Sequence, residues 1–208
     1  LSDSPQPGAT GSTLSAQTGN LSLNAGANIA LDSASSGVAQ GDVTANAATG
    51  DLTVIEQSKL LAQTGQMDLD AGNRVSFTDS SATAATSMTV DATDAGITLN
   101  NSHATAGTDL SLDAGSDITL TDSTAPGATG SSLSAQTGDL SLNAGGNIAL
   151  HSASSGVASG DLIANAGTGD LTVIEQSALT ARTGKLDLDA GHRVGVTDST
   201  LSAATDLT

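Results

Sequence analysis

A short alternating unit returns along the chain: an apolar residue, a polar one, a second apolar one, then Asn or Asp, then Ala. It reads LSLNA at 21–25, MDLDA at 67–71 and LSLDA at 110–114. Alternation with a period of two over four or five residues indicates a β-strand with one buried face. A helix would need apolar residues three and four apart, and the frequent glycines would interrupt it. The pattern therefore predicts an all-β chain.

The unit recurs at nearly constant spacing. Its first apolar residue falls at positions 21, 43, 67, 88, 110, 140, 162, 186 and 207, so that successive units lie 22, 24, 21, 22, 30, 22, 24 and 21 residues apart. Each repeat predicts three short strands, which in the third repeat are 60–63, 67–70 and 74–78. The turn residues Thr64-Gly65 and Ala71-Gly72 separate them.

About 22 residues in three strands, without a helix between them, are typical of one coil of a parallel β-helix. Each strand would then pair with its equivalent in the next coil, and roughly nine coils at about 4.8 Å would form a rod of about 40 Å. Two inward columns are expected, namely Leu21, Val43, Met67, Met88, Leu110, Leu140, Leu162 and Leu186, and Ile29, Leu52, Val75, Ile97, Ile118, Ile148, Leu171 and Val194. The outward positions Ser22, Thr44, Asp68, Thr89 and Ser111 alternate with them. An antiparallel sandwich is the alternative fold, but it does not explain the constant coil length.

A longer repeat is superimposed on the coils. Residues 1–89 align without gaps on residues 120–208, and roughly 65 of the 89 positions are identical. The larger spacing of 30 residues reflects an inserted loop at 123–130, and its equivalent at 4–11 precedes the first unit. The chain does not start with Met, and both ends fall inside these units. We therefore expect a single β-helical segment over residues 1–208 that is a fragment of a longer fibre.

Composition narrows the function classes. Phe77 is the sole aromatic residue, so the core must be built from aliphatic side chains. The net charge of −17, with only five Lys and Arg, disfavours nucleic acid and anionic membrane surfaces as partners. The chain has no cysteine, which excludes disulfides and thiol catalysis. No apolar run approaches the roughly 20 residues that cross a bilayer, so we expect no membrane insertion.

The Asn or Asp of each unit forms a column of its own. It consists of Asn24, Asn46, Asp70, Asp91, Asp113, Asn143, Asn165 and Asp189. Such side chains cap turns by bonding nearby backbone, so a stacked ladder at a corner of the coil is the structural interpretation. A calcium site over Asp70, Asp91 and Asp113 is the functional alternative. The GGxGxD nonapeptide of calcium-binding β-rolls is absent, and GGN at 145–147 comes closest to it.

Candidate catalytic residues are few. Glu56 and Glu175 are the only glutamates and are one long repeat apart, so they cannot form the carboxylate pair of a glycosidase. Only Phe77 could stack on a sugar. The histidines His103, His151 and His192 occupy three different positions in their coils, which disfavours a metal site or a triad. We therefore expect no catalytic, cofactor-binding or metal-binding residues and no enzymatic activity.

Three lesser features remain. Corner ion pairs could join Arg74 to Asp70 and Arg193 to Asp189. Threonines such as Thr53, Thr98, Thr119 and Thr172 form columns that could bind ice, but only the sequence TLT at 119–121 has the TxT spacing of an ice face. Asn20 and Asn100 begin N-x-S/T sequons.

The repeats resemble a known family. The strings GDLSLNAGGNIAL at 138–150, GQMDLDAGNRVSF at 65–77 and TDLSLDAGSDITL at 108–120 are similar to the haemagglutinin repeats of filamentous haemagglutinin-like exoproteins. The resemblance covers essentially the whole chain. It implies a long right-handed β-helical fibre, exported from a Gram-negative bacterium by two-partner secretion through an outer-membrane β-barrel transporter. Such proteins serve as adhesins, biofilm matrix proteins or toxin-presenting stalks in contact-dependent inhibition.

These observations lead to one expected function and one alternative. We expect the chain to be the structural shaft of a secreted or cell-surface fibre that extends a distal adhesive or effector region. The alternative is a binding module that contacts host cells, glycans or other fibres through the side of the rod or through the loops at 4–11 and 123–130. Those loops are rich in Pro and Gly, and binding residues are often found on such segments. A receptor on a host cell or bacterial surface would be the partner in either case.

Overall fold

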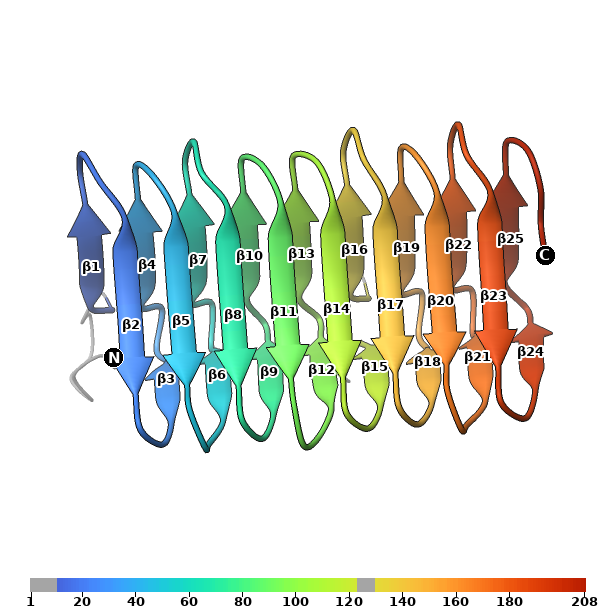
Figure 1. Cartoon of the computed structure of the whole chain (residues 1–208), viewed down its shortest axis with the longest axis horizontal. Helices are drawn as coiled ribbons and strands as arrows, with labels where there is room; N and C mark the ends of the chain where they lie inside the picture. Colours follow the sequence, from blue (N-terminus) through green and yellow to red (C-terminus); the bar gives the residue numbers. More distant parts are fainter. Residues whose placement is uncertain (1–10, 123–129) are drawn as a thin grey trace.

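The alternating segments form short parallel strands that wind into a right-handed β-solenoid (Figure 1). The computed structural model describes residues 11–122 and 130–208. These residues contain 25 strands and no helix. Each coil, meaning one turn of the solenoid, carries three strands, and the chain makes about eight turns of roughly 23 residues. The predicted all-β parallel β-helix is thus confirmed.

The strands stack into three sheets, here called A, B and C, in which every neighbouring pair is parallel. Sheet A contains β1 (Thr13–Ala16), β4 (Ser36–Ala39), β7 (Lys59–Ala62), β10 (Ser81–Ala84), β13 (His103–Ala106), β16 (Ser132–Ala135), β19 (Ser155–Ala158), β22 (Ala178–Ala181) and β25 (Thr200–Ala203). Sheet B contains β2 (Leu21–Ala25), β5 (Val43–Ala47), β8 (Met67–Ala71), β11 (Met88–Ala92), β14 (Leu110–Ala114), β17 (Leu140–Ala144), β20 (Leu162–Ala166) and β23 (Leu186–Ala190). Sheet C contains β3 (Ile29–Leu31), β6 (Leu52–Ile55), β9 (Val75–Thr78), β12 (Ile97–Asn100), β15 (Ile118–Thr121), β18 (Ile148–Leu150), β21 (Leu171–Ile174) and β24 (Val194–Thr197).

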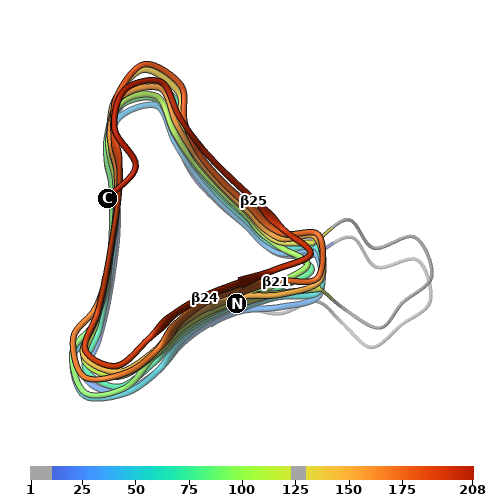
Figure 2. The ribbon, with the colours of Figure 1, turned by 90° about the vertical axis from the view of Figure 1, so that its right-hand side faces the viewer.

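Seen along the rod, the three sheets form the sides of a triangle (Figure 2). The register is the one that the repeats predict, because Leu21 pairs with Val43 and Val43 pairs with Met67. The second predicted column is also in register, with Ile97 opposite Ile118. The strand bounds differ from the prediction by one residue at several ends, for example β7, which begins at Lys59. Local alternation does not settle which terminal residue still pairs with the neighbouring coil.

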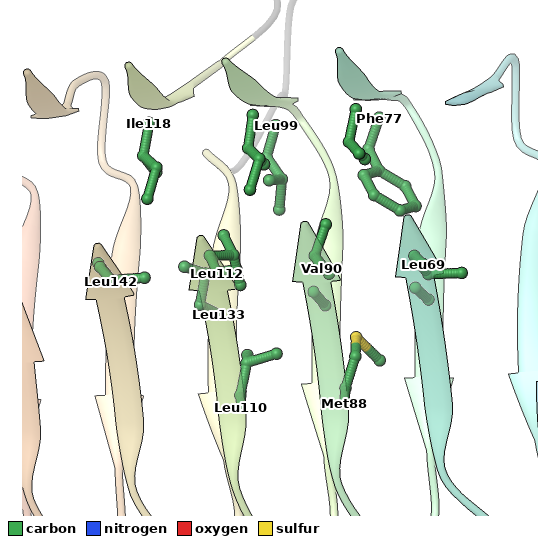
Figure 3. Close-up of a cluster of buried hydrophobic side chains, with 14 of the residues drawn as sticks. Leu69, Phe77, Met88, Val90, Leu99, Leu110, Leu112, Ile118, Leu133 and Leu142 are labelled. Atoms are coloured by element: carbon green, nitrogen blue, oxygen red, sulfur yellow. The ribbon is translucent and has the colours of Figure 1, made fainter. Parts of the chain in front are cut away.

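The core is a narrow aliphatic column inside this triangle (Figure 3). Alternate residues of each strand point inward, as in the burial of Leu110, Leu112 and Ala114 along β14. Phe77 is 1% exposed and fills the interior at β9, between Val54 and Leu99 of the adjoining coils. Because rows of Leu, Ile, Val, Met and Ala repeat from coil to coil, every inner coil buries the same kind of surface.

Glycine replaces leucine at one inward position of sheet A. Gly156 in β19 lies between Leu133 and Leu179, and a Cβ at Gly156 would approach Leu179 Cδ2 to 2.8 Å. Gly37 occupies the equivalent place in β4, where an added Cβ would lie 2.9 Å from Leu60 Cδ2. At these two coils glycine leaves the space that the leucines of the adjoining coils fill, as a close-packed core requires.

The corner between sheet C and the next strand of sheet A, called the C–A corner, has a left-handed backbone. Glu56 and Gln57 have φ values of 56° and 62°, whereas the shorter corner at Asp79 has a single such residue with φ of 50°. Part of the variation in coil length is thus taken up at this corner. The inserted loop predicted at 123–130 falls between β15 and β16, but residues 123–129, like residues 4–10 of the other predicted loop, lie outside the described part of the chain.

Candidate functional site

The acidic strand residues are confined to one side of the rod. Sheet B carries all the Asp residues found in the described strands, and each of them points outward: Asp68, Asp70, Asp91, Asp113, Asp187 and Asp189. The described strands of sheets A and C contain no Asp or Glu. A cation attracted to strand carboxylates would therefore meet them on the outer side of sheet B.

The Asn and Asp column lies inside the strands of sheet B, one residue before each strand ends. Its members pair coil to coil, as Asp70 does with Asp91 and Asp91 with Asp113. These residues bond to other side chains: Asn143 Nδ2 donates to Asp113 Oδ1 at 2.8 Å, and Asn24 Nδ2 donates to Ser22 Oγ at 2.8 Å. The expectation that this column caps a corner is wrong. The side chains point to the outer side of the sheet, and the hydrogen bonds described for them go to side chains.

The corner ladders are built by different residues, which directly precede the strands of sheets B and C. Before sheet B, Asn20 Oδ1 accepts the amide of Asp42 at 2.9 Å, and Asp139 Oδ1 accepts the amide of Asp161 at 2.7 Å. Before sheet C, Asn147 Oδ1 accepts the amide of Asp170 at 2.8 Å. In each case the side chain bonds the equivalent residue of the next coil. Stacked Asx side chains therefore satisfy the corner backbone from these positions, which were not predicted from the sequence.

Asp70 lies in the most acidic part of this surface. Partial burial, followed by the charges of Asp68 and Asp91, raises the pKa of Asp70 above its usual value. The parallel register places Asp68 and Asp70 on the strand next to that of Asp91. The described strands of sheet B contain no Lys, Arg or His that could offset these charges. The carboxylates therefore repel one another across the sheet, which mildly opposes folding at neutral pH.

A shallow hollow of about 390 Å³ lies beside this ladder. Its polar lining comes from Asp91, Asp113, Thr93 and Asn143, together with backbone and small residues where β11, β14 and β17 end. Both carboxylates already accept hydrogen bonds, Asp113 from Ser111 and Asn143, and Asp91 from Thr93. Over the described ranges, no group of three or more His, Asp and Glu side chains is placed to hold a metal ion. The geometry gives no support to a calcium site.

The glutamates lie at the C–A corner on separate coils. Ser33 Oγ donates to Glu56 Oε2 at 3.2 Å, and Ser152 Oγ donates to Glu175 Oε2 at 3.0 Å. Five strand steps of sheet C separate β6 from β21, which is about 24 Å along the rod. That separation is far beyond the span of a glycosidase carboxylate pair. Phe77 is buried in the core, so its ring cannot form a sugar platform.

The histidines and arginines are dispersed. His103 lies on the outer side of sheet A, with its Nδ1 2.7 Å from Ser132 Oγ. His151 follows β18, and His192 is exposed between β23 and β24. The expected ion pair between Arg193 and Asp189 is wrong, because Arg193 Nη2 contacts Asp170 Oδ2 at 2.8 Å.

No ion pair of Arg74 is found among the described residues. The threonine column of sheet C contains Thr53, Thr98, Thr119 and Thr172, as predicted. Ser76 and Ala149 interrupt it, so a regular array of threonine pairs is not formed.

A column of buried serines was not anticipated from the sequence. These residues directly precede the strands of sheet A and are Ser35, Ser58, Ser80, Ser102, Ser131, Ser154 and Ser177, all at most 7% exposed. Ser102 Oγ accepts the amide of Ser80 at 3.1 Å and donates to Asn100 O at 2.8 Å. Serine recurs at this place in every coil, whereas the neighbouring positions vary, and that invariance is the signal that could have revealed the column. Its role is structural, since it satisfies buried backbone groups at the C–A corner.

Comparison with family models, with curated proteins and with solved structures gave no match. The described residues form no helix that is long and apolar enough to cross a bilayer. The functional proposal therefore rests on the solenoid, its surfaces and the repeat pattern.

Proposed function

We propose that this chain is a segment of the structural shaft of a secreted or cell-surface fibre of a Gram-negative bacterium. The shaft would hold a distal adhesive or effector region away from the cell. An outer-membrane β-barrel transporter would export the protein, and a receptor on a host cell or another bacterium would be the distal partner. The resemblance of the repeats to filamentous haemagglutinin-like exoproteins supports each of these assignments.

The observation that carries the proposal is the uninterrupted stacking of equivalent coils. Sheets A, B and C run through all the described coils with constant register, and the core has the same composition throughout. In such an architecture each coil contacts only its neighbours, so length can change without a change in local structure. The near-duplication of residues 1–89 at 120–208 fits a rod whose length is the selected property.

Excision of one long repeat tests the shaft assignment. Removing residues 21–139 joins Asn20 to Leu140, which reproduces the Asp139–Leu140 junction and deletes 119 residues. In the producing bacterium, the fibre should become about 24 Å shorter, five coils at about 4.8 Å, and should attach to the same cells as before. A matched variant inserts a second copy of residues 21–139 after Asp139, and its fibre should be about 24 Å longer with the same attachment. Loss of attachment specificity on excision would assign the binding role to this segment and refute a purely mechanical one.

Localisation tests the export assignment independently. An antibody against this chain should label intact cells, and the label should disappear when the gene of its outer-membrane transporter is deleted. Labelling only after cell lysis would overturn the proposal of a surface fibre.

A binding module remains the second candidate, because sheets A and C present strand surfaces free of acid in a strongly acidic protein. In that case the segment itself would contact a cell or glycan. Deleting residues 123–130 tests the inserted loop alone: attachment should be lost while the circular dichroism spectrum stays unchanged. If attachment survives, the loop at 123–130 is not the binding element.

A further inference from the structure

The outer side of sheet A, here called face A, differs from the rest of this acidic molecule. Its outward residues are the first and third of each strand, and Lys59 and His103 are the only ionisable ones among the described strands of this sheet. The third positions carry only small neutral or aliphatic side chains: Ser15, Val38, Leu61, Thr83, Thr105, Ser134, Val157, Thr180 and Ser202. A protein with a net charge of −17 thus has a long side on which the described strands carry no carboxylate.

Face A is also more regular than the outer side of sheet C. All nine strands of sheet A have four residues, so both outward columns continue from β1 to β25. In sheet C, β3 and β18 have only three residues, and Ala30, Ala149 and Gly195 break the outward column. The outward column of sheet B contains the carboxylate ladder. Only face A therefore combines strands of equal length with the absence of carboxylates over the described length of the rod.

We propose that face A is a lateral self-association surface, on which a second copy of this chain packs side by side. Two charges of −17 repel each other, so a close approach of two copies requires surfaces without carboxylates at the contact. Face A meets that condition on both partners at once. The strands are about 4.8 Å apart in each copy. The outward side chains of one face A can therefore pack between those of the other along the whole rod.

The size of face A indicates weak pairing for a segment of this length. Nine strands at about 4.8 Å and four residues at about 3.3 Å cover roughly 550 Å² on each rod, or about 1,100 Å² for the pair. Specific protein interfaces usually bury about 1,200–2,000 Å², so this segment lies near the lower limit. Because the contact area grows with every coil, pairing should strengthen with rod length.

The association of the purified chain can be measured directly. Sedimentation equilibrium from micromolar to about 1 mM protein should show a reversible monomer–dimer equilibrium. Raising the ionic strength from about 0.01 to 0.15 M shortens the Debye length from about 30 to about 8 Å, so dimerisation should strengthen with salt. Small-angle scattering should show a dimer with the maximum length of the monomer and a larger cross-section.

Three substitutions in one coil locate the contact. Thr105→Asp places a carboxylate on β13 of sheet A, Ser111→Asp on β14 of sheet B and Thr119→Asp on β15 of sheet C. Thr105→Asp should raise the dimer dissociation constant about tenfold or more, because it opposes like charges at the contact. The other two variants carry the same added charge and should change it much less. Circular dichroism and thermal unfolding establish that all three variants fold.

Three results would overturn the proposal. The first is a chain that stays monomeric at about 1 mM protein and about 0.15 M ionic strength, where long-range repulsion is already screened. The second is a dimer with about twice the monomer length, which would mean end-to-end pairing through open strand edges. The third is a loss of dimerisation in Ser111→Asp or Thr119→Asp that equals the loss in Thr105→Asp.

Discussion

The hydroxyl of Ser131 accepts a hydrogen bond from the backbone amide of Ser102 at 3.2 Å, across a sequence separation of 29 residues. The equivalent bond between Ser58 Oγ and the Ser35 amide spans 23 residues. The serine column thus continues past the position of the insertion at 123–130 without a change in its geometry. The hydrogen bonds of the corner and of the sheets hold the coils in register. An insertion of extra residues at the C–A corner leaves these bonds intact.

Removing a buried serine hydroxyl should destabilise the rod. Ser102→Ala removes the acceptor of the Ser80 amide and the donor to Asn100 O, so we expect a loss of about 1–3 kcal/mol. Ser134→Ala, on the outer side of β16, is the control and should stay within about 0.5 kcal/mol. Urea denaturation measures both. Equal midpoints for the two variants would show that the serine column contributes nothing to stability.

The corner caps depend on an acceptor oxygen and do not require a charge. Asp139→Ala should cost about 1 kcal/mol, because the Asp161 amide loses its partner at 2.7 Å. Asp139→Asn should be nearly neutral, since Asn20 makes the same bond to Asp42 one long repeat earlier. Thermal unfolding of the two variants distinguishes them. The prediction fails if the asparagine variant is as unstable as the alanine variant.

The space at Gly156 is already occupied by leucine side chains. An added Cβ would lie 2.8 Å from Leu179 Cδ2 and 3.2 Å from Leu140 Cδ2, so Gly156→Ala should overpack the core and cost about 1–3 kcal/mol. Gly26→Ala is the control, because no atom lies within 4 Å of its Cβ position. Chemical denaturation should separate the two variants. An unchanged midpoint for Gly156→Ala would mean that the leucine tips move aside freely.

The acidic ladder should make stability depend on pH in a defined direction. The folded state raises the pKa of Asp70, so protonation of this carboxylate favours folding. Above the raised pKa the ionised carboxylate lowers the stability of the fold. This unfavourable contribution disappears as the pH falls below the pKa of Asp70 in the unfolded chain. Asp70→Asn should therefore raise the Tm at pH 7 and have little effect near pH 2, well below the ordinary Asp pKa of about 3.9.

Asp187→Asn is the matched control for Asp70→Asn and should act in the opposite direction. Lys185 and Thr208 bond the Asp187 carboxylate and lower its pKa, so its contribution is favourable above the unfolded pKa and is lost as the pH falls through the folded one. The variant should therefore lower the Tm at pH 7. A common sign for the two variants at pH 7 would contradict the electrostatic interpretation.

Several features of the candidate site could not be predicted from the sequence. The Asn and Asp column was expected at a corner, yet Asp91 and Asp113 stand on the outer side of sheet B, because each strand extends one residue further, to the following Ala. A one-residue change in where a strand ends changes which Asx side chain reaches the turn backbone. Phe77 is the one ring that could have stacked on a sugar, and its position in the inward row of β9 places it in the core.

The amino-acid sequence by itself determined the strands, the inward columns and the coil length, because alternation with a period of two and its recurrence are local properties. Only the tertiary structure decided which polar groups meet, since the bonds from Asp161 to Asp139 and from Ser80 to Ser102 join residues 22 apart in the chain. It also decided how charge is distributed around the rod. Acidic residues are spread along the sequence, but the three sheets face different directions. In the described strands the carboxylates therefore lie on one side of the rod, and the other two sides have none. This separation exists only once the coils are stacked.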